Sequence, residues 1–514
     1  MALPETLVRS RSAVVFLKEE DTAGTFNGLP DASNAFALTS VPTIAQAGNY
    51  TDTSEIGSEL ITTKKVLNYM DYATFDMEFY AKPSGTAGTA PTEDKLMEWF
   101  FGKKSTVAST SVTYSLQNKM TTFTTWSQQF TDESFQLYVG QGCVPTTWGV
   151  SLAKDGPVTF SMGVQSNKVL YGGTAEVQSV GADDSGTGST QLVTLKGPTR
   201  YDGATMIASD IAFDGMQVDF LDASANPPYS TILSGGTDKL VSATSGTAGT
   251  LNVPNGVSGA ADGDLMVPSL PTADCTSGDA MDQRAVAVYM GKTPEFGTVT
   301  FTDATCDVTS GAATIGHDAN ANIKVGLKVS GTGIPAGAFI TTINSSTQFT
   351  ISANATASNN NETLTFVADY SSILDVSGSS SADIFHADNK LNVTAVSVDV
   401  DRSLSTPGLT EMTGDEYPAA SYVINEPTIS GSMTLLLRPK DFQMLSGLRA
   451  LPVRSLGIEI GSVAGKKIQI AAPAVHMEVP TPGEADGAVQ IDVTFTVVKQ
   501  ADCNDEDKFI VRYV

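Results

Sequence analysis

Short runs in which apolar and polar residues alternate recur along the chain, and glycine-rich turns separate them. In one run Phe75, Met77 and Phe79 alternate with polar residues, and the runs at 429–437 and 489–497 have the same period. Because neighbouring side chains of a strand point to opposite faces, a period of two predicts strands with one buried face. The pattern therefore predicts an all-β fold with a few short helices.

The predicted strands form a unit that occurs twice, near residues 30–170 and again near 385–514. In each copy a weak strand and a long polar stretch precede a stronger strand, which ends at a basic residue and proline, Lys82-Pro83 or Arg438-Pro439. Internal similarity of this kind indicates a duplicated structural unit.

The closing part of each copy supports the duplication. Gln136–Val164 and Lys467–Phe495 align without a gap. In both segments an Asp-Gly pair, Asp155-Gly156 or Asp486-Gly487, precedes a clean alternating run. Asp-Gly before an alternating run is a hairpin signal, so each unit is expected to end in a hairpin.

A short helix is predicted after the strong strand of each copy. In the first copy Thr92 can cap a helix over 93–100, whose first turn is acidic. In the second copy Asp441 can cap the helix. The apolar residues expected on one face of these helices are Leu96, Trp99, Phe100, Phe442, Leu445 and Leu448.

Four segments follow from this organisation. Residues 297–367 hold short strands separated by glycine turns, which is typical of a small β-sandwich or barrel, and 238–267 resembles a second such stretch. We therefore expect a first unit, a connecting region that is partly a small β module, an inserted β module and a second unit, at 1–170, 171–296, 297–367 and 368–514.

The charge balance argues against a nucleic-acid-gripping protein. The chain carries 30 Lys and Arg against 56 Asp and Glu, for a net charge of −26. Basic residues occur as isolated pairs such as Lys64-Lys65 and Lys466-Lys467, without a basic stripe. Such a chain should repel phosphate, which excludes tight DNA binding but suits a conduit through which DNA passes.

No motif for catalysis, metal or cofactor binding emerges. The four cysteines form no C-x-x-C pair, and the three histidines, His317, His386 and His476, lie in no ligand motif. Gly461–Lys467 has the glycines of a phosphate loop one residue too close and is interpreted as a strand turn. The apolar run 13–17 is too short for a signal peptide, and no stretch approaches ~20 apolar residues. We expect no enzyme, no cofactor and no membrane partner.

The second copy resembles the tail tube family of long-tailed bacteriophages. The resemblance lies in Pro427–Leu437, in Asp441-Phe442 and in Gly487–Thr496, where a Gly-Ser-hydrophobic strand precedes a short helix and an alternating strand closes the domain. In the first copy, Phe75–Phe79 departs from the Gly-Ser pattern. The module at 297–367 is similar to immunoglobulin-like domains inserted in phage virion proteins.

The resemblance implies β-sandwich domains with a flanking helix, six of which close each ring into a continuous β-barrel. Two units per chain would make the ring a homotrimer with pseudo-sixfold symmetry. Rings would stack into a tube in the virion tail, after assembly in the bacterial cytoplasm. The implied partners are further copies of the chain, a tape measure protein, and tail tip and neck completion proteins, while DNA passes through without tight binding.

The resemblance also assigns roles to segments. Long loops at 45–67 and 401–422 would contact the next ring. The residues expected in them are Asn49, Tyr50, Glu55, Ile56, Arg402, Leu404, Glu411 and Met412. The inner-barrel strands would carry Phe75, Met77, Phe79, Met433, Leu435, Val158, Phe160, Val493 and Phe495.

Three alternatives remain open at this point. A bacterial adhesin or surface-layer protein fits the Thr/Ser/Gly-rich β modules, although no signal peptide is recognised. A capsid decoration protein has no need of the repeat. A carbohydrate-active enzyme needs a pair of carboxylates on a scaffold, and nothing singles out a pair among so many acids.

Overall fold

The structure is a computed structural model of the 514-residue chain. It describes residues 13–25, 28–57, 60–130, 135–153, 155–181, 190–196, 207–225, 228–254, 257, 259–273, 279–292, 300–368, 384–385, 389–406, 417–419, 421–438, 453–478, 481–485, 487–499 and 508–514. Strands β1 to β35 dominate these residues, with one α-helix and three short 3-10 turns. The predicted all-β class with few helices is confirmed.

Seven strands form the first unit, called repeat 1. β1 pairs with β2 and β8, β8 pairs with β9, and β9 also pairs with β10 and β11, while β10 pairs with β5. Their bounds are β1 Ala13–Glu19, β2 Ala35–Phe36, β5 Ala73–Tyr80, β8 Phe123–Phe130, β9 Phe135–Leu152, β10 Thr159–Ser166 and β11 Lys168–Gly173.

The second unit, repeat 2, has the same pairings in the same chain order. β19 pairs with β26 and β31, β31 pairs with β32, and β32 also pairs with β34 and β35, while β34 pairs with β30. Their bounds are β19 Val286–Lys292, β26 Lys390–Leu391, β30 Thr428–Leu436, β31 Arg454–Val463, β32 Lys466–Met477, β34 Ala488–Val497 and β35 Ile510–Tyr513. Repeat 2 thus includes β19, a strand that the sequence placed in the connecting region.

The two repeats also share their registers. Met77 lies opposite Met162 in repeat 1. At the corresponding point of repeat 2, Met433 lies opposite Val493. Two residues further along, Phe75 opposes Val164, whereas Gly431 opposes Phe495. A side chain at Gly431 would collide with the Phe495 ring and with the Ser397 carbonyl, so repeat 2 exchanges the large and the small position of this pair.

Two strand pairings join the repeats into one 18-stranded sheet. β27 (Val393–Asp401) pairs with β30 of repeat 2 and with the end of β9 of repeat 1. β35 of repeat 2 pairs with β7 (Ser111–Leu116), which forms a hairpin with β6 (Gly102–Val107). One hydrophobic core runs through both repeats.

The helix α1 (Asp94–Phe101) belongs to repeat 1 and buries the predicted face of Leu96, Trp99 and Phe100. Its N-cap is Glu93 and not Thr92, and no side chain caps it, because Glu93 turns back to accept hydrogen bonds from the Lys82 N–H. The helix predicted for the second copy, with Asp441, Phe442, Leu445 and Leu448, lies outside the described residues.

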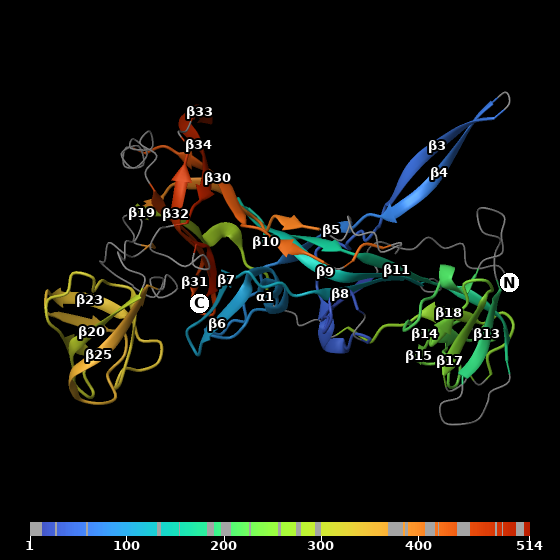
Figure 1. Cartoon of the computed structure of the whole chain (residues 1–514), viewed down its shortest axis with the longest axis horizontal. Helices are drawn as coiled ribbons and strands as arrows, with labels where there is room; N and C mark the ends of the chain where they lie inside the picture. The colour runs from blue at the N-terminus through green and yellow to red at the C-terminus, as the bar shows by residue number, and fades with distance from the viewer. Residues whose placement is uncertain are drawn as a thin grey trace.

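Two further domains are inserted into this framework and lie on the same side of the long sheet, at its opposite ends (Figure 1). A seven-stranded sheet between β11 and β19 packs its core against repeat 1. Its strands are β12 Ala175–Val180, β13 Thr190–Lys196, β14 Gln217–Leu221, β15 Lys239–Leu240, β16 Ala243–Thr244, β17 Thr250–Pro254 and β18 Leu265–Pro268.

The second insert is a six-stranded domain with its own core. It lies between β19 and β26, and therefore within repeat 2 rather than before it as the sequence suggested. Its strands are β20 Thr300–Val308, β21 Thr314–Gly316, β22 Leu327–Ser330, β23 Ile340–Ser345, β24 Gln348–Ile351 and β25 Asn359–Ala368.

Candidate assembly surfaces

The largest functional candidate is one face of the sheet that joins the repeats. Six strands lie side by side here, in the order β5, β10, β9, β27, β30 and β34. The residues that the sequence assigned to an inner barrel are all buried against the core on the other face, namely Phe75, Met77, Phe79, Val158, Phe160, Met433, Leu435, Val493 and Phe495. The exposed face therefore carries the alternate residues.

Most of these alternate side chains are small and polar or acidic, and Tyr80 at the end of β5 is an exposed aromatic exception. One row across all six strands reads Glu78, Ser161, Gly149, Asp399, Ser430 and Thr496. The exposed acids of the face are Asp76, Glu78, Asp399, Asp401 and Asp492. None of the six strands, all of which the structure describes, contains a lysine or an arginine. Partial burial raises the pKa of Asp399 above its usual value.

The first predicted stacking loop is a long two-stranded hairpin of β3 (Gly48–Gly57) and β4 (Leu60–Met70), which pair only with each other among the described strands. It reaches away from the sheet (Figure 1). Tyr50, Val66 and Leu67 are exposed along it, and Asn49 donates a hydrogen bond to the Tyr69 hydroxyl. Glu55 and Ile56 lie in β3, and their side chains are outside the described part.

A counterpart of this hairpin begins at the same place in repeat 2. β28 (Leu404–Ser405) pairs with β29 (Val423–Ile424), and Leu404 opposes Ile424 as Gly48 opposes Met70. Glu411 and Met412, also predicted there, lie outside the described residues. The two predicted loops thus share a base, and one of them is described along most of its length.

Arg402 corrects one prediction. It was expected in a stacking loop, but its side chain is 2% exposed and points into repeat 1. Its guanidinium donates to the carbonyl oxygens of Phe100 at 2.6 Å, and of Gln117 and Lys119 at 2.9 Å. It therefore caps the end of α1 from repeat 2. Burial lowers the pKa of Arg402 to about 10, so the group stays charged at neutral pH.

Glu93 is a second buried group between the repeats. Its carboxyl accepts a 2.5 Å hydrogen bond from the Tyr513 hydroxyl at the end of β35. Burial raises its pKa to about 7, against the opposing effect of the Tyr513 and Lys82 hydrogen bonds. The Asp94 carboxylate next to it accepts from Tyr114 and Lys104. The contact joins the start of α1 in repeat 1 to the last strand of repeat 2.

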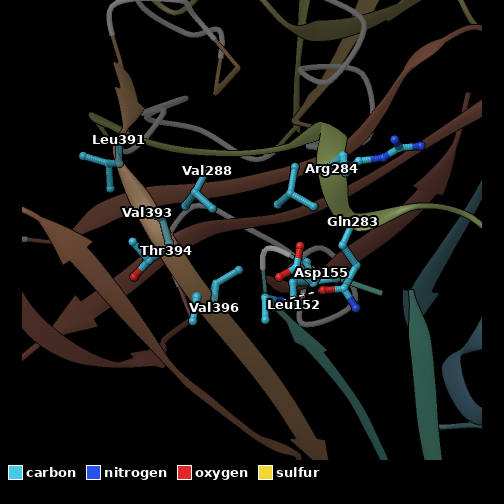
Figure 2. Close-up of a pocket in the computed structure, with 12 residues that line it drawn as sticks. Leu152, Asp155, Gln283, Arg284, Val288, Leu391, Val393, Thr394 and Val396 are labelled. Carbon is cyan, nitrogen blue, oxygen red and sulfur yellow. Dashed lines mark hydrogen bonds between the residues drawn. The ribbon is translucent and has the colours of Figure 1, made fainter. Parts of the chain in front are cut away.

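A groove of about 440 Å³ follows the join between β27 and the end of β9. Val288, Val393 and Val396 of repeat 2 and Leu152 of repeat 1 surround the same space (Figure 2). Gln283 closes one side, because its amide accepts from the Ala153 N–H and donates to the Pro157 carbonyl.

The groups with catalytic or ligand chemistry are dispersed. His317 is buried against Phe349 in the six-stranded insert, and Cys143 and Cys306 are buried free thiols. In the described part of the chain no three His, Cys, Asp or Glu residues are grouped for a metal ion. Gly461–Lys467 forms the turn between β31 and β32, as predicted. His386, Cys275 and Cys503 lie outside the described residues.

No helix in the described residues has the length and apolar character needed to span a membrane.

Sequence reasoning missed the two buried contacts between the repeats. Nothing in the sequence near Arg402 or Glu93 distinguishes them from surface charges, because their partners lie hundreds of residues away. One signal could have found Arg402. When the two copies are aligned at Pro83 and Pro439, Arg402 falls on the uncharged Gln46, so the copies differ in charge at this position.

Comparison with known proteins adds little. No family model matches the chain, and no curated protein matches it. Among the solved structures that match is a chain of the sheath-tube complex of an extracellular contractile injection system, PVC, in its extended state. It shares 9% sequence identity and a TM-score of 0.22, over 32% of this chain and 92% of that one. A likeness this slight carries no argument, so function is inferred from the molecule itself.

Proposed function

We propose that this chain is the structural subunit of a bacteriophage tail tube, which polymerises into a hollow conduit for DNA ejection. The observation that most directly supports this proposal is the continuous face of mostly small polar and acidic side chains on six strands that span both repeats. The proposal makes this face the wall of the channel.

The chemistry of the face suits a passage for DNA. Small side chains leave a smooth wall, and the exposed carboxylates repel phosphates over about 8–10 Å at physiological salt. The absence of lysine and arginine from these six strands removes the groups that would hold the DNA backbone. DNA would thus pass without being retained.

The repeats explain how a ring could close. Two equivalent units per chain allow three chains to supply six units, so the ring is a homotrimer with pseudo-sixfold symmetry. A closed sheet leaves no free strand edges on the wall. The hairpin of β3 and β4 and its counterpart at β28 and β29 would contact the next ring, with Tyr50, Val66 and Leu67 as apolar contacts.

Within this proposal the chain acts in the virion tail, after assembly in the host cytoplasm, and has no catalytic role. Further copies of the chain are its main partner, and a tape measure protein would fill the channel during assembly. Proteins of the tail tip and neck would complete the two ends.

Electron microscopy of the purified protein tests the proposal. We expect hollow tubes whose rings contain three chains, with near-sixfold symmetry at the inner wall and the inserted domains outside. Discrete particles without a channel, as expected of an adhesin, or six chains per ring would contradict it. Salt-dependent binding of duplex DNA at submicromolar affinity would contradict the assignment of the acidic face to the channel.

A further inference from the structure

The join between the repeats has an unoccupied counterpart on the outer side of repeat 1. There a groove of about 820 Å³ is lined by Val14, Val15, Phe36, Leu38 and Val41, with Ala13, Ala37, Thr39, Ser40 and Ala273. By the shared registers, Val14 corresponds to Val286 of the internal groove, and 37–40 correspond to 393–396. The two grooves are the same feature in the two repeats.

The two grooves differ in the residues that line one of their sides. Leu152, Ala153 and Asp155, at the end of β9, line the internal groove and come from the other repeat. The outer groove has no such contribution and is nearly twice as large. A segment equivalent to the end of β9 is therefore what the outer groove lacks.

The segment beside the outer groove, residues 37–45, also lacks a neighbouring strand on one side in the part of the chain that the structure describes. Residues 37–45 correspond to β27, and the Thr39 N–H donates to the Glu78 carbonyl as Ala395 pairs with Thr434. Yet 37–45 form no strand, whereas β27 lies between two strands and is a continuous strand with one register shift, between Val393 and Ala395. The side of 37–45 that faces away from β5 has no partner strand among those described.

The complementary edge lies at the other end of the chain. β33 (Thr481–Ala485) pairs only with β34 among the described strands, and it corresponds to the end of β9. Pro482, Gly483 and Glu484 on it are exposed. The gap-free alignment places Gly483 at the position of Leu152, but β33 pairs with β34 one residue out of that alignment, and Glu484, opposite Val489, takes the structural position of Leu152.

We propose that the outer groove of one chain receives β33 of a second copy, and that this contact repeats the internal join of β9 and β27. Ser40 would then face Glu484 of the other copy, as Val396 faces Leu152 within the chain. The contact is head-to-tail, so it generates a ring if the rotation closes. The inference rests on the proposed function only in identifying that ring with one ring of the tube.

Proline distinguishes the two free edges from the internal join. Pro42 lies in 37–45 and Pro482 lies in β33, whereas the corresponding residues of the internal join are Val398 and Val150, which lie opposite each other. Proline cannot donate a ladder hydrogen bond, and it protects exposed edges from indiscriminate pairing. Two prolines at the edges are consistent with edges that must stay unpaired until the correct copy arrives.

Cysteine cross-linking between two singly substituted chains tests the contact. Ser40→Cys and Glu484→Cys replace residues whose side chains are both exposed in the single chain. Each variant is first checked for wild-type thermal unfolding. When the two are mixed and oxidised, we expect one cross-linked dimer, while each alone gives none. The double variant should give dimers and then trimers as the largest closed product.

A matched control replaces Ser310, which is exposed in the six-stranded insert, by cysteine, and its mixture with Ser40→Cys should not cross-link. Dimers from Ser40→Cys alone, or no product at the highest soluble concentration, would overturn the inference. Cross-linked chains without hollow tubes would leave the inference standing and refute the tube. Hollow tubes without this cross-link would refute the inference and leave the proposed tube standing.

Discussion

The internal join and the outer edges of the chain are built from equivalent strands but are secured differently. At the internal join β27 lies between β30 and β9, and Arg402 follows it into the core of the other repeat. At the outer edge the residue equivalent to Arg402 is Gln46. Its amide donates to the carbonyls of Asp71 and Asn167 and accepts from the Val169 N–H, all within repeat 1.

This difference separates a permanent contact from a reversible one. The internal join forms as the chain folds, because the buried Arg402 guanidinium finds its hydrogen-bond acceptors only when both repeats are in place. The outer edge satisfies the Gln46 side chain within its own repeat and presents mainly apolar and hydroxyl side chains and backbone. A chain can therefore fold alone and associate later.

The largest effect is expected from Arg402→Met. The substitution leaves the carbonyls of Phe100, Gln117 and Lys119 without their donor, and a buried acceptor left unsatisfied costs about 1–3 kcal/mol. Denaturant unfolding followed by tryptophan fluorescence should show this loss. Arg284→Met, at an exposed arginine, is the control. A loss for Arg402→Met below about 1 kcal/mol would mean that the arginine does not secure the join.

A pH-dependent effect is expected at Glu93. Its folded pKa of about 7 lies above the ordinary value of 4.5 for a glutamate carboxyl. The folded state therefore binds this proton more tightly, and its contribution is complete below about pH 4.5 and lost as the pH rises to about 7. The pKa difference corresponds to about 3 kcal/mol.

Glu93→Gln removes this titration. Relative to the wild type, the variant should gain stability as the pH rises from about 5 to 8, in unfolding experiments at a series of pH values. Glu98→Gln on the same helix is the control. A difference between variant and wild type that stays constant with pH would show that Glu93 is ionised in the folded chain.

A smaller effect, on the association between chains, is expected from a substitution at the outer edge. Pro42→Val restores an N–H at the position equivalent to Val398, and one additional ladder hydrogen bond contributes about 1 kcal/mol. Association between chains should tighten about fivefold in sedimentation equilibrium. Thr43→Val, which changes no backbone donor, should leave the association constant unaltered. Unchanged association of Pro42→Val would place the contact elsewhere.

The smallest effect is expected from removing most of the six-stranded insert. Tyr289 of β19 lies opposite Lys390 of β26, so a short Gly-Ser bridge in place of 297–367 can connect the two strands. The deletion retains Ile384 and Phe385, which pack near Gly457 of β31. Assembly should match the full chain in electron micrographs. A deletion variant that folds but does not assemble would give the insert a role in the contact.

The alternation of apolar and polar residues predicted those features of the fold that depend on residues close together in the sequence. Alternation identified strands such as β5 and β34 together with their buried faces, and the gap-free alignment predicted the shared hairpin. The position of β19 could not be predicted, because an inserted domain separates it from the strands of its own repeat. Arg402 and Glu93 look like ordinary surface charges until the tertiary fold brings α1, β27 and β35 together.

The insertion point in repeat 2 has a thermodynamic consequence. Between the first two strands, repeat 1 has only residues 20–34, whereas repeat 2 has residues 293–389. Loop-closure entropy grows with the logarithm of length, so this extension costs only about 1–2 kcal/mol even for a flexible chain. A whole folded domain can thus be gained, exchanged or lost here without altering a strand of the acidic face, which makes this turn a natural place to attach foreign domains.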